Sequence, residues 1–316
     1  MSDKKVIAVI GATGAQGGGL ARAILADPES EFAVRALTRD PTKEQAQALA
    51  AAGAEIVQAD ISDEESTRAA FEGAYGAFCV TNFWETFSGE TELVQAGNMA
   101  RAAKAAGIQH AIWSTLEDTR TFIPLDDDRM PTLQERFKVP HFDAKEEANQ
   151  SFTDAGVPTT FLYTAFYWEN FIFFGLGPQR GEDGTLAITF PLGRAKMPAM
   201  AAEDIGKIAF AIFKAGSQLI GTSVYIAGEH LSGSELAAAF TDALDEEVVY
   251  NEVEPDVYRT FDFPGADELG NMFQFKRDFE SDYVGHRDLD KTRALNPELL
   301  DFRTWLAQNA NRIPIS

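Results

Sequence analysis

A closely spaced run of glycines near the N-terminus is the feature of this chain with the clearest chemical use. The segment Gly11-Ala12-Thr13-Gly14-Ala15-Gln16-Gly17 has a glycine at every third position and directly follows the apolar run Val6–Ile10. Glycines permit a tight turn and a close approach of the backbone to a pyrophosphate, and unpaired N–H groups at the start of the next helix attract an anion. Many proteins share this spacing, but here it stands between a strand pattern and a helix pattern, which predicts dinucleotide binding.

The residue at the end of the second apolar run distinguishes between the two nicotinamide dinucleotides. An acidic side chain there would hydrogen-bond the ribose 2′-hydroxyl of NAD, whereas this sequence has Arg39, about 20 residues after Gly17. A guanidinium is permanently charged and suits a phosphate, and Lys43 adds charge nearby. Because Pro41 follows Asp40, we expect Asp40 to cap the next helix and to point away. The sequence predicts NADP(H) binding; the alternative is that Arg39 is a solvated surface arginine.

Alternating apolar runs and Ala-rich amphipathic stretches must position these residues. This alternation is typical of consecutive βα units that form a parallel sheet. The expected strands are Val6–Ile10, Phe32–Thr38, Glu55–Gln58, Tyr75–Thr81, Ile108–Ser114 and one near Thr159–Tyr163. The expected helices are Gln16–Ala26, Thr42–Ala52, Glu64–Phe71, Ser88–Ala106 and one near Phe142–Ala155. The pattern predicts an α/β fold with a doubly wound parallel sheet of the Rossmann type.

The rest of the chain predicts a smaller lobe. The segment Thr119–Val139 is rich in proline and aspartate, and we expect a surface loop that covers the cofactor cleft. After Tyr163 the sequence becomes aromatic-rich and shows no clear linker. Later expected elements are helices near Glu203–Ala215 and Gly233–Leu244 and a strand near Ser223–Ala227. We therefore expect an NADP(H)-binding domain over residues 1–164 and a smaller, interleaved α+β lobe over residues 165–316 for a substrate or partner.

Composition and charge exclude several classes of function. A formal net charge of −22 repels nucleic-acid backbones and anionic membranes, and no apolar run approaches the length of a membrane span. The single cysteine, Cys79, allows no intramolecular disulfide and reads as a small buried residue. Four scattered histidines and the loop aspartates at 126–128 do not suggest a metal site. Without a signal-peptide pattern at the N-terminus, we expect a cytoplasmic, or also nuclear, protein without metal, membrane or nucleic-acid partner.

Five segments taken together resemble the NmrA-like family of atypical short-chain dehydrogenases/reductases. They are Gly11–Gly17, Thr38-Arg39, Thr81–Glu85, His141–Lys145 and Tyr167–Asn170, and the resemblance extends to Phe263–Ala266 and Asn271–Phe273. It covers nearly the whole chain. Very many proteins share the glycine turn, whereas the combination with the other four segments is much more specific.

The resemblance implies a complete set of NADP(H) contacts. It assigns the pyrophosphate to Gly11, Ala12, Thr13, Gly14, Ala15, Gln16 and Gly17, the 2′-phosphate to Arg39, the adenine side to Asp60 and Ile61, the ribose and pyrophosphate edge to Thr81, Asn82 and Phe83, and the nicotinamide half to Lys145, Tyr167, Trp168, Glu169 and Asn170. Independently, Asp60 and Thr81 follow strands at the carboxyl edge of the expected sheet, where open α/β folds bind ligands. The alternative for Thr81 and Asn82 is turn chemistry. The aromatic run Phe166–Phe174 is expected either to floor a substrate pocket or to form a core between the two lobes.

The candidate catalytic residues are Lys145 and His141, and they depart from the pattern of ordinary short-chain dehydrogenases. Those enzymes use a Tyr four residues before a Lys, and this chain has His141 at the Tyr position. A helix would place both side chains on one face, with Lys145 on the nicotinamide ribose and an imidazole able to act as acid or base. The alternative is that His141, which follows Pro140, caps or packs the helix. Ser114 lies at the end of the fifth expected strand, where those enzymes often have a substrate-orienting hydroxyl, but it does not decide between the catalytic and the packing interpretation of His141.

Two functions follow from these readings. The resemblance and the missing Tyr favour a redox sensor, in which NADP(H) occupancy is read by a regulatory protein partner. Retention of Lys145 and the aromatic second lobe favour instead an NADPH-dependent reductase of the isoflavone reductase-like type, acting on a small aromatic or carbonyl substrate. Whether the chain catalyses a reaction stays open at the level of sequence.

Overall fold

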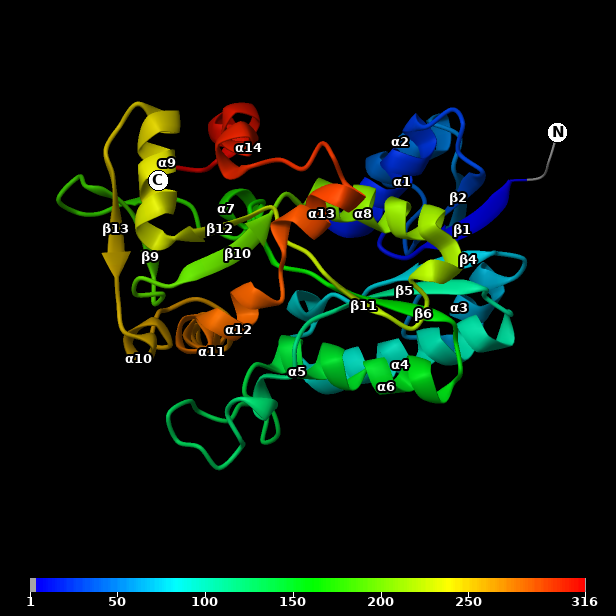
Figure 1. The fold of residues 1–316 in the computed structure, drawn as a ribbon, viewed down its shortest axis with the longest axis horizontal. Helices are drawn as coiled ribbons and strands as arrows, with labels where there is room; N and C mark the ends of the chain where they lie inside the picture. Colours follow the sequence, from blue (N-terminus) through cyan, green and yellow to red (C-terminus); the bar gives the residue numbers. More distant parts are fainter. Residues whose placement is uncertain (1–3, 316) are drawn as a thin grey trace. The chain divides into compact units, whose positions relative to one another are not determined.

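The chain forms two compact units in a computed structural model that describes residues 4–315 (Figure 1). Unit 1 contains the described residues up to Asp118 together with His141–Thr164 and Ala202–Val224. Unit 2 contains Thr119–Pro140, Ala165–Ala201 and the described residues from Tyr225 onward. Residues 119–140 therefore belong to the second unit although they precede residue 165, and residues 202–224 belong to the first unit although they follow it.

Unit 1 is built on a seven-stranded sheet with the order β11-β6-β5-β4-β1-β2-β3. Its strands are β1 (Lys5–Val9), β2 (Phe32–Thr38), β3 (Glu55–Gln58), β4 (Gly76–Cys79), β5 (His110–Thr115), β6 (Thr159–Tyr163) and β11 (Ser223–Tyr225). Every neighbouring pair from β3 to β6 is parallel. Because the chain moves outward from β1 first to one side and then to the other, this is the doubly wound Rossmann order that the sequence predicted.

Helices cover both faces of this sheet (Figure 1). They are α1 (Ala15–Ala26), α2 (Glu44–Ala51), α3 (Glu64–Phe71), α4 (Gly89–Ala105), α5 (Pro140–Glu147), α6 (Asn149–Asp154) and α8 (Ala202–Ala215). Helices α1 and α8 pack so closely on one face that a Cβ atom at Gly206 would lie 2.1 Å from the Leu20 nitrogen. On the other side, the single helix expected over residues 142–155 is two helices, with Ala148 between them.

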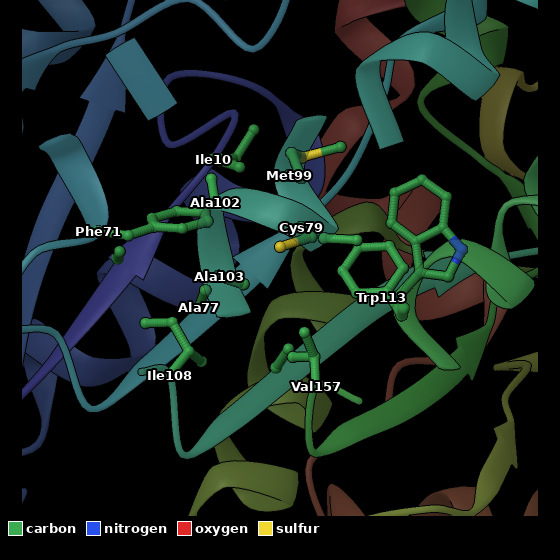
Figure 2. Packing of buried hydrophobic residues seen from close by; sticks show 14 of the residues in the cluster. Ile10, Phe71, Ala77, Cys79, Met99, Ala102, Ala103, Ile108, Trp113 and Val157 are labelled. Carbon is green, nitrogen blue, oxygen red and sulfur yellow. The ribbon is translucent and has the colours of Figure 1, made fainter. Parts of the chain in front are cut away.

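One hydrophobic core cluster of unit 1 lies between the sheet and helices α3, α4 and α6 (Figure 2). Ile10, Cys79 and Trp113 contribute from the strand side, and Phe71 and Met99 from the helices. Parallel strands with helices on both faces are buried on both sides, which is why every residue of β4 and β5 is buried and exposure does not alternate along them. Cys79 is fully buried and burial raises the pKa of its thiol, so its interpretation as a small core residue is confirmed.

Unit 2 combines two small sheets with short helices. One sheet has the order β12-β10-β7 and the other β13-β9-β8. The strands are β7 (Phe166–Tyr167), β8 (Gln179–Arg180), β9 (Leu186–Phe190), β10 (Lys196–Met200), β12 (Glu229–Ser232) and β13 (Val248–Glu252). The helices are α7 (Asn170–Phe173), α9 (Gly233–Leu244), α10 (Pro255–Tyr258), α11 (Ala266–Asp278), α12 (Glu280–Gly285), α13 (Leu289–Leu295) and α14 (Phe302–Asn309). The expected α+β character of the second lobe is present.

The segment Thr119–Val139 is irregular and mostly exposed or half-buried, as expected of a surface loop, but parts of it are packed. Met130 and Phe137 are fully buried. Asn271 of α11 donates its amide N–H groups to the carbonyl oxygens of Pro131 at 2.9 Å and Lys138 at 2.5 Å. Prolines and aspartates interrupt the hydrophobic periodicity of this segment. Hydrogen bonds from side chains to its backbone carbonyls take the place of the backbone hydrogen bonds that a helix or strand would provide. Within residues 4–315, none of the helices is both long and apolar enough to span a membrane.

Candidate functional site

The glycine turn joins the end of β1 to the start of α1 and leaves that helix start open. Gly11 has a φ of +65°, a conformation that favours glycine, and the Gly14 N–H closes the turn on the Gly11 carbonyl at 2.8 Å. A Cβ atom at Gly17 would lie 2.5 Å from the Ile10 oxygen, so this glycine lets α1 pack on the strand. Gly14 is the N-cap of α1 and supplies no side-chain cap. No N-cap side chain therefore stands at the first turn, where backbone N–H groups and the helix dipole suit a pyrophosphate.

Arg39 lies directly after β2, where the sequence placed it, and is held by Glu85. Its two terminal nitrogens donate to the two carboxylate oxygens of Glu85 at 2.9 and 2.8 Å. Glu85 belongs to the short 3-10 helix Phe83–Glu85 that follows β4, and the Asn82 amide also donates to it at 3.2 Å. Both charged side chains are largely exposed. Sequence analysis included Glu85 in a family segment but gave it no role, because nothing in the spacing links it to Arg39.

Asp40 does not cap helix α2, which corrects one expectation. The helix begins at Glu44 with Lys43 as its N-cap. The Asp40 carboxylate instead accepts hydrogen bonds from the Thr42 N–H at 2.9 Å and hydroxyl at 2.5 Å. These bonds hold the pKa of Asp40 below its usual value and keep the carboxylate in its own turn.

Asp60 and Ile61 follow β3 at the same edge of the sheet, as expected. One Asp60 carboxylate oxygen accepts from the Ser62 N–H at 2.9 Å. The Ile61 carbonyl accepts from the Asn98 amide of α4 at 3.1 Å. The turn is thus held by its own polar groups and by a neighbouring helix, so the residues assigned to the adenine side have fixed backbone positions.

Lys145 takes part in a buried polar cluster with Thr81 and Glu92. Its ammonium group lies 2.7 Å from Glu92 Oε1, 2.6 Å from the Thr81 hydroxyl and 3.2 Å from the Thr81 carbonyl. The Thr81 hydroxyl donates to the same Glu92 oxygen at 2.5 Å. An ammonium group has three N–H donors, so these three acceptors satisfy it completely. The side chains of Lys145 and Glu92 are only 11% and 2% exposed.

The backbone of Lys145 is fixed by the central sheet. The Trp113 indole N–H and the Thr115 hydroxyl, both on β5, donate to the Lys145 carbonyl at 3.2 and 3.0 Å. The second carboxylate oxygen of Glu92 is buried and has no hydrogen-bond partner within residues 4–315. Sequence reasoning missed Glu92, because an acid in the first turn of α4 is already explained by the helix dipole.

His141 lies in the first turn of α5 and packs among aromatic rings. It is 6% exposed, and its ring centroid is 5.2 Å from that of Trp84 and 5.7 Å from that of Phe83. The structure therefore brings His141 and Lys145 onto one short helix, with the imidazole against the aromatic segment that follows β4. Ser114 is buried on β5. The packing interpretation of His141 has direct geometric support, and its catalytic interpretation stays a prediction.

The remaining candidates, Tyr167 to Asn170, belong to unit 2. Trp168 is fully buried and packs on Phe302 and Trp305, with ring centroids 5.4 and 6.0 Å apart. Glu169 accepts from the Trp305 indole N–H at 3.2 Å. Trp168 and Glu169 therefore take part in the aromatic core of unit 2. The assignment of this segment to the nicotinamide half stays a prediction from the family resemblance.

Comparison with known proteins decides the family. The model of the NmrA-like family matches residues 3–306, which is nearly the whole chain. The chain belongs to the NmrA-like family. A curated NmrA-like relative, the NmrA-like family domain-containing oxidoreductase FrzB of Cladobotryum sp., is 30% identical over 294 residues, covering 85% of this chain and 83% of the relative. The oxidoreductase hkm9 of Aspergillus hancockii is 29% identical, covering 92% and 88%.

Solved structures of NmrA-like proteins have the same fold. NmrA, described as a negative transcriptional regulator, in complex with NADP is 25% identical with a TM-score of 0.76, covering 97% of this chain and 95% of that chain. Its complex with NAD has a TM-score of 0.78 at the same identity and coverage. A triphenylmethane reductase of Citrobacter sp. complexed with NADP(H) is 18% identical with a TM-score of 0.75, covering 97% and 99%, and shows the fold alone. Since NmrA has been crystallised with either dinucleotide, NmrA-like membership by itself does not choose between them.

Proposed function

We propose that this protein binds NADP(H) at the carboxyl edge of the unit 1 sheet and acts as a redox-responsive regulator read by a partner protein. The observation that carries the cofactor proposal is the uncapped start of α1 behind the glycine turn, with Arg39 at the end of the adjacent strand β2. The turn suits a pyrophosphate and the guanidinium suits a 2′-phosphate. NADP in complex with NmrA supports the same proposal.

The cofactor contacts proposed within unit 1 are those that the family resemblance implies, and their positions at this edge of the sheet support them. The backbone of Gly11–Gly17 would hold the pyrophosphate, Arg39 the 2′-phosphate, Asp60 and Ile61 the adenine side, and Thr81–Phe83 the ribose edge. Lys145 would reach the ribose only by exchanging one of its bonds to Thr81 or Glu92, because those bonds satisfy its three donors. Tyr167–Asn170 of unit 2 are carried as nicotinamide-side candidates by the family resemblance alone.

Arg39→Ala is expected to remove most of the preference for NADP(H). Loss of a charge-assisted pair to the phosphate should weaken NADP(H) binding by about 1.5 to 3 kcal/mol and leave NAD(H) binding little changed. Calorimetric titration of the wild type and the variant with both dinucleotides measures this. An equal loss of affinity for NAD(H) would show that Arg39 supports the fold of the site and does not read the phosphate.

The regulatory part of the proposal rests on the contacts of His141 and Lys145. His141 stands where ordinary short-chain dehydrogenases have their Tyr, and its ring packs among aromatic rings. The Lys145 ammonium group is hydrogen-bonded to Thr81 and Glu92. The description of NmrA as a negative transcriptional regulator supports the same proposal. A cytoplasmic or nuclear address belongs to this proposal.

An NADPH-dependent reductase of a small aromatic or carbonyl substrate is the second candidate, favoured by the curated relatives named as oxidoreductases. NADPH would supply a hydride, and His141, one turn from Lys145, would supply a proton. Steady-state NADPH oxidation against quinones, aldehydes, imines and benzylic ethers tests this. If a substrate is found, His141→Ala should lower turnover roughly 10²- to 10⁴-fold with little change in NADPH affinity. Undiminished turnover in the variant would make the imidazole structural.

A further inference from the structure

The ion pair between Arg39 and Glu85 connects two strand ends that are not neighbours in the sheet. Arg39 follows β2 and Glu85 lies in the 3-10 helix after β4, and the strand order β4-β1-β2 places β1 between them. Strands in a sheet are about 4.8 Å apart, so the pair reaches across roughly twice that distance. It therefore spans the carboxyl end of β1, from which the glycine turn begins.

The pair uses the whole recognition face of the guanidinium. Both terminal nitrogens of Arg39 are directed at the two oxygens of one carboxylate, at 2.9 and 2.8 Å. A fork of this kind binds either a carboxylate or a phosphate in the same two-point geometry. A 2′-phosphate approaching Arg39 would meet a guanidinium already occupied by another anion, and the carboxylate would repel it.

Neighbouring groups hold both partners in this arrangement. The Asn82 amide donates to Glu85 Oε1 at 3.2 Å. The Gln58 amide donates to the Arg39 carbonyl at 3.0 Å, which fixes the backbone from which the guanidinium extends. Glu85 is thus oriented toward Arg39 by a residue of its own segment.

We infer that Glu85 is a specificity-determining residue that competes with the 2′-phosphate of NADP(H) for Arg39. This inference rests on the proposed NADP(H) site. NAD(H) carries no 2′-phosphate and leaves the pair closed, whereas NADP(H) must take Arg39 from Glu85. Glu85 therefore lowers the affinity for NADP(H) and narrows the difference between the two dinucleotides. Because both side chains are largely exposed, at 63% and 43%, the pair is weak enough to be opened by the ligand.

Glu85→Gln keeps the size of the side chain and removes the competing charge. We expect NADP⁺ affinity to rise about 2- to 5-fold, in the range of an exposed ion pair, and NAD⁺ affinity to change less than about 2-fold. The matched control is Glu246→Gln in unit 2. Glu246 holds Arg180 in the same two-point arrangement, at 2.7 and 3.1 Å, and its removal changes the net charge equally. Calorimetric titration of both variants with NADP⁺ and NAD⁺ is the measurement.

The outcomes separate this inference from the proposed function. Tighter NADP⁺ binding in Glu85→Gln but not in Glu246→Gln, lost when Arg39→Ala is added, supports competition at Arg39. In a second outcome, the wild type prefers NADP⁺ over NAD⁺ through Arg39 while Glu85→Gln binds NADP⁺ no more tightly than the wild type. That result overturns the role of Glu85 and leaves the proposed NADP(H) site standing. An equal gain for NAD⁺ also overturns it, since NAD⁺ offers no phosphate to Arg39. A wild type that binds neither dinucleotide overturns both proposals.

Discussion

Replacing Gly14 with valine is expected to abolish NADP(H) binding while the protein still folds. Gly14 has an ordinary extended backbone, and a Cβ atom there would meet only the Gly11 carbonyl, at 3.2 Å. The branched side chain would instead occupy the open start of α1, where the pyrophosphate is proposed to accept N–H bonds. Losing two charge-assisted bonds of about 1.5 to 3 kcal/mol each lowers affinity more than about 100-fold. Calorimetric titration with NADPH measures the loss.

A matched substitution controls for the general effect of a β-branched residue on a glycine position. Gly285 lies at the end of α12, and a Cβ atom there would meet nothing within 4 Å. Gly285→Val should therefore bind NADPH like the wild type. If a folded Gly14→Val protein keeps its NADPH affinity, the glycine turn does not hold the pyrophosphate.

Lys145→Met is expected to cost about 3 to 5 kcal/mol of the free energy of unfolding. The substitution removes the ammonium group but leaves the Glu92 carboxylate 2% exposed and without its counter-ion. One oxygen of Glu92 already has no hydrogen-bond partner among the described residues, so the site offers no replacement donor. Adding Glu92→Leu should recover a large part of the loss, because the double variant buries no charge. Urea denaturation of the single and double variants measures both effects.

An exposed ion pair provides the control for the variants of Lys145 and Glu92. Lys5 donates to Glu31 at 2.8 Å at the surface of unit 1, and Lys5→Met should change stability little, because solvent screens such pairs. A Lys145→Met variant no less stable than Lys5→Met would contradict the account of the buried cluster. So would a double variant that is no more stable than the single one.

Much of unit 1 was predictable because local signals and the fold agree there. The bounds expected for β2, β3 and β6 are those observed, since each apolar run ends at a turn. The break between α5 and α6 was missed, because Ala148 does not interrupt the helical pattern. In unit 2, β7 and β8 are two residues long, too short to carry any periodicity. Such strands depend on partners distant in sequence, as when β10 pairs with both β7 and β12.

In the candidate site, too, some residues could be predicted from the sequence and others could not. Arg39 could be placed from sequence, because its position follows from the length of one βαβ unit. Glu85 and Glu92 could not be assigned partners, because Arg39 and Lys145 reach them from other segments of the chain. Spacing indicates which residues share an element, but only the folded sheet shows which side chains meet at its edge. The acidic residues that pair with Arg39 and Lys145 are therefore the part of the site that could not be predicted from the sequence.

Titration of the wild-type protein with NADPH and NADH is the measurement that tests the central claim most directly. The account predicts that NADPH binds at one site per chain and at least about tenfold more tightly than NADH, because Arg39 can pair with the 2′-phosphate. Equal affinity for the two dinucleotides, or binding of neither, would contradict it.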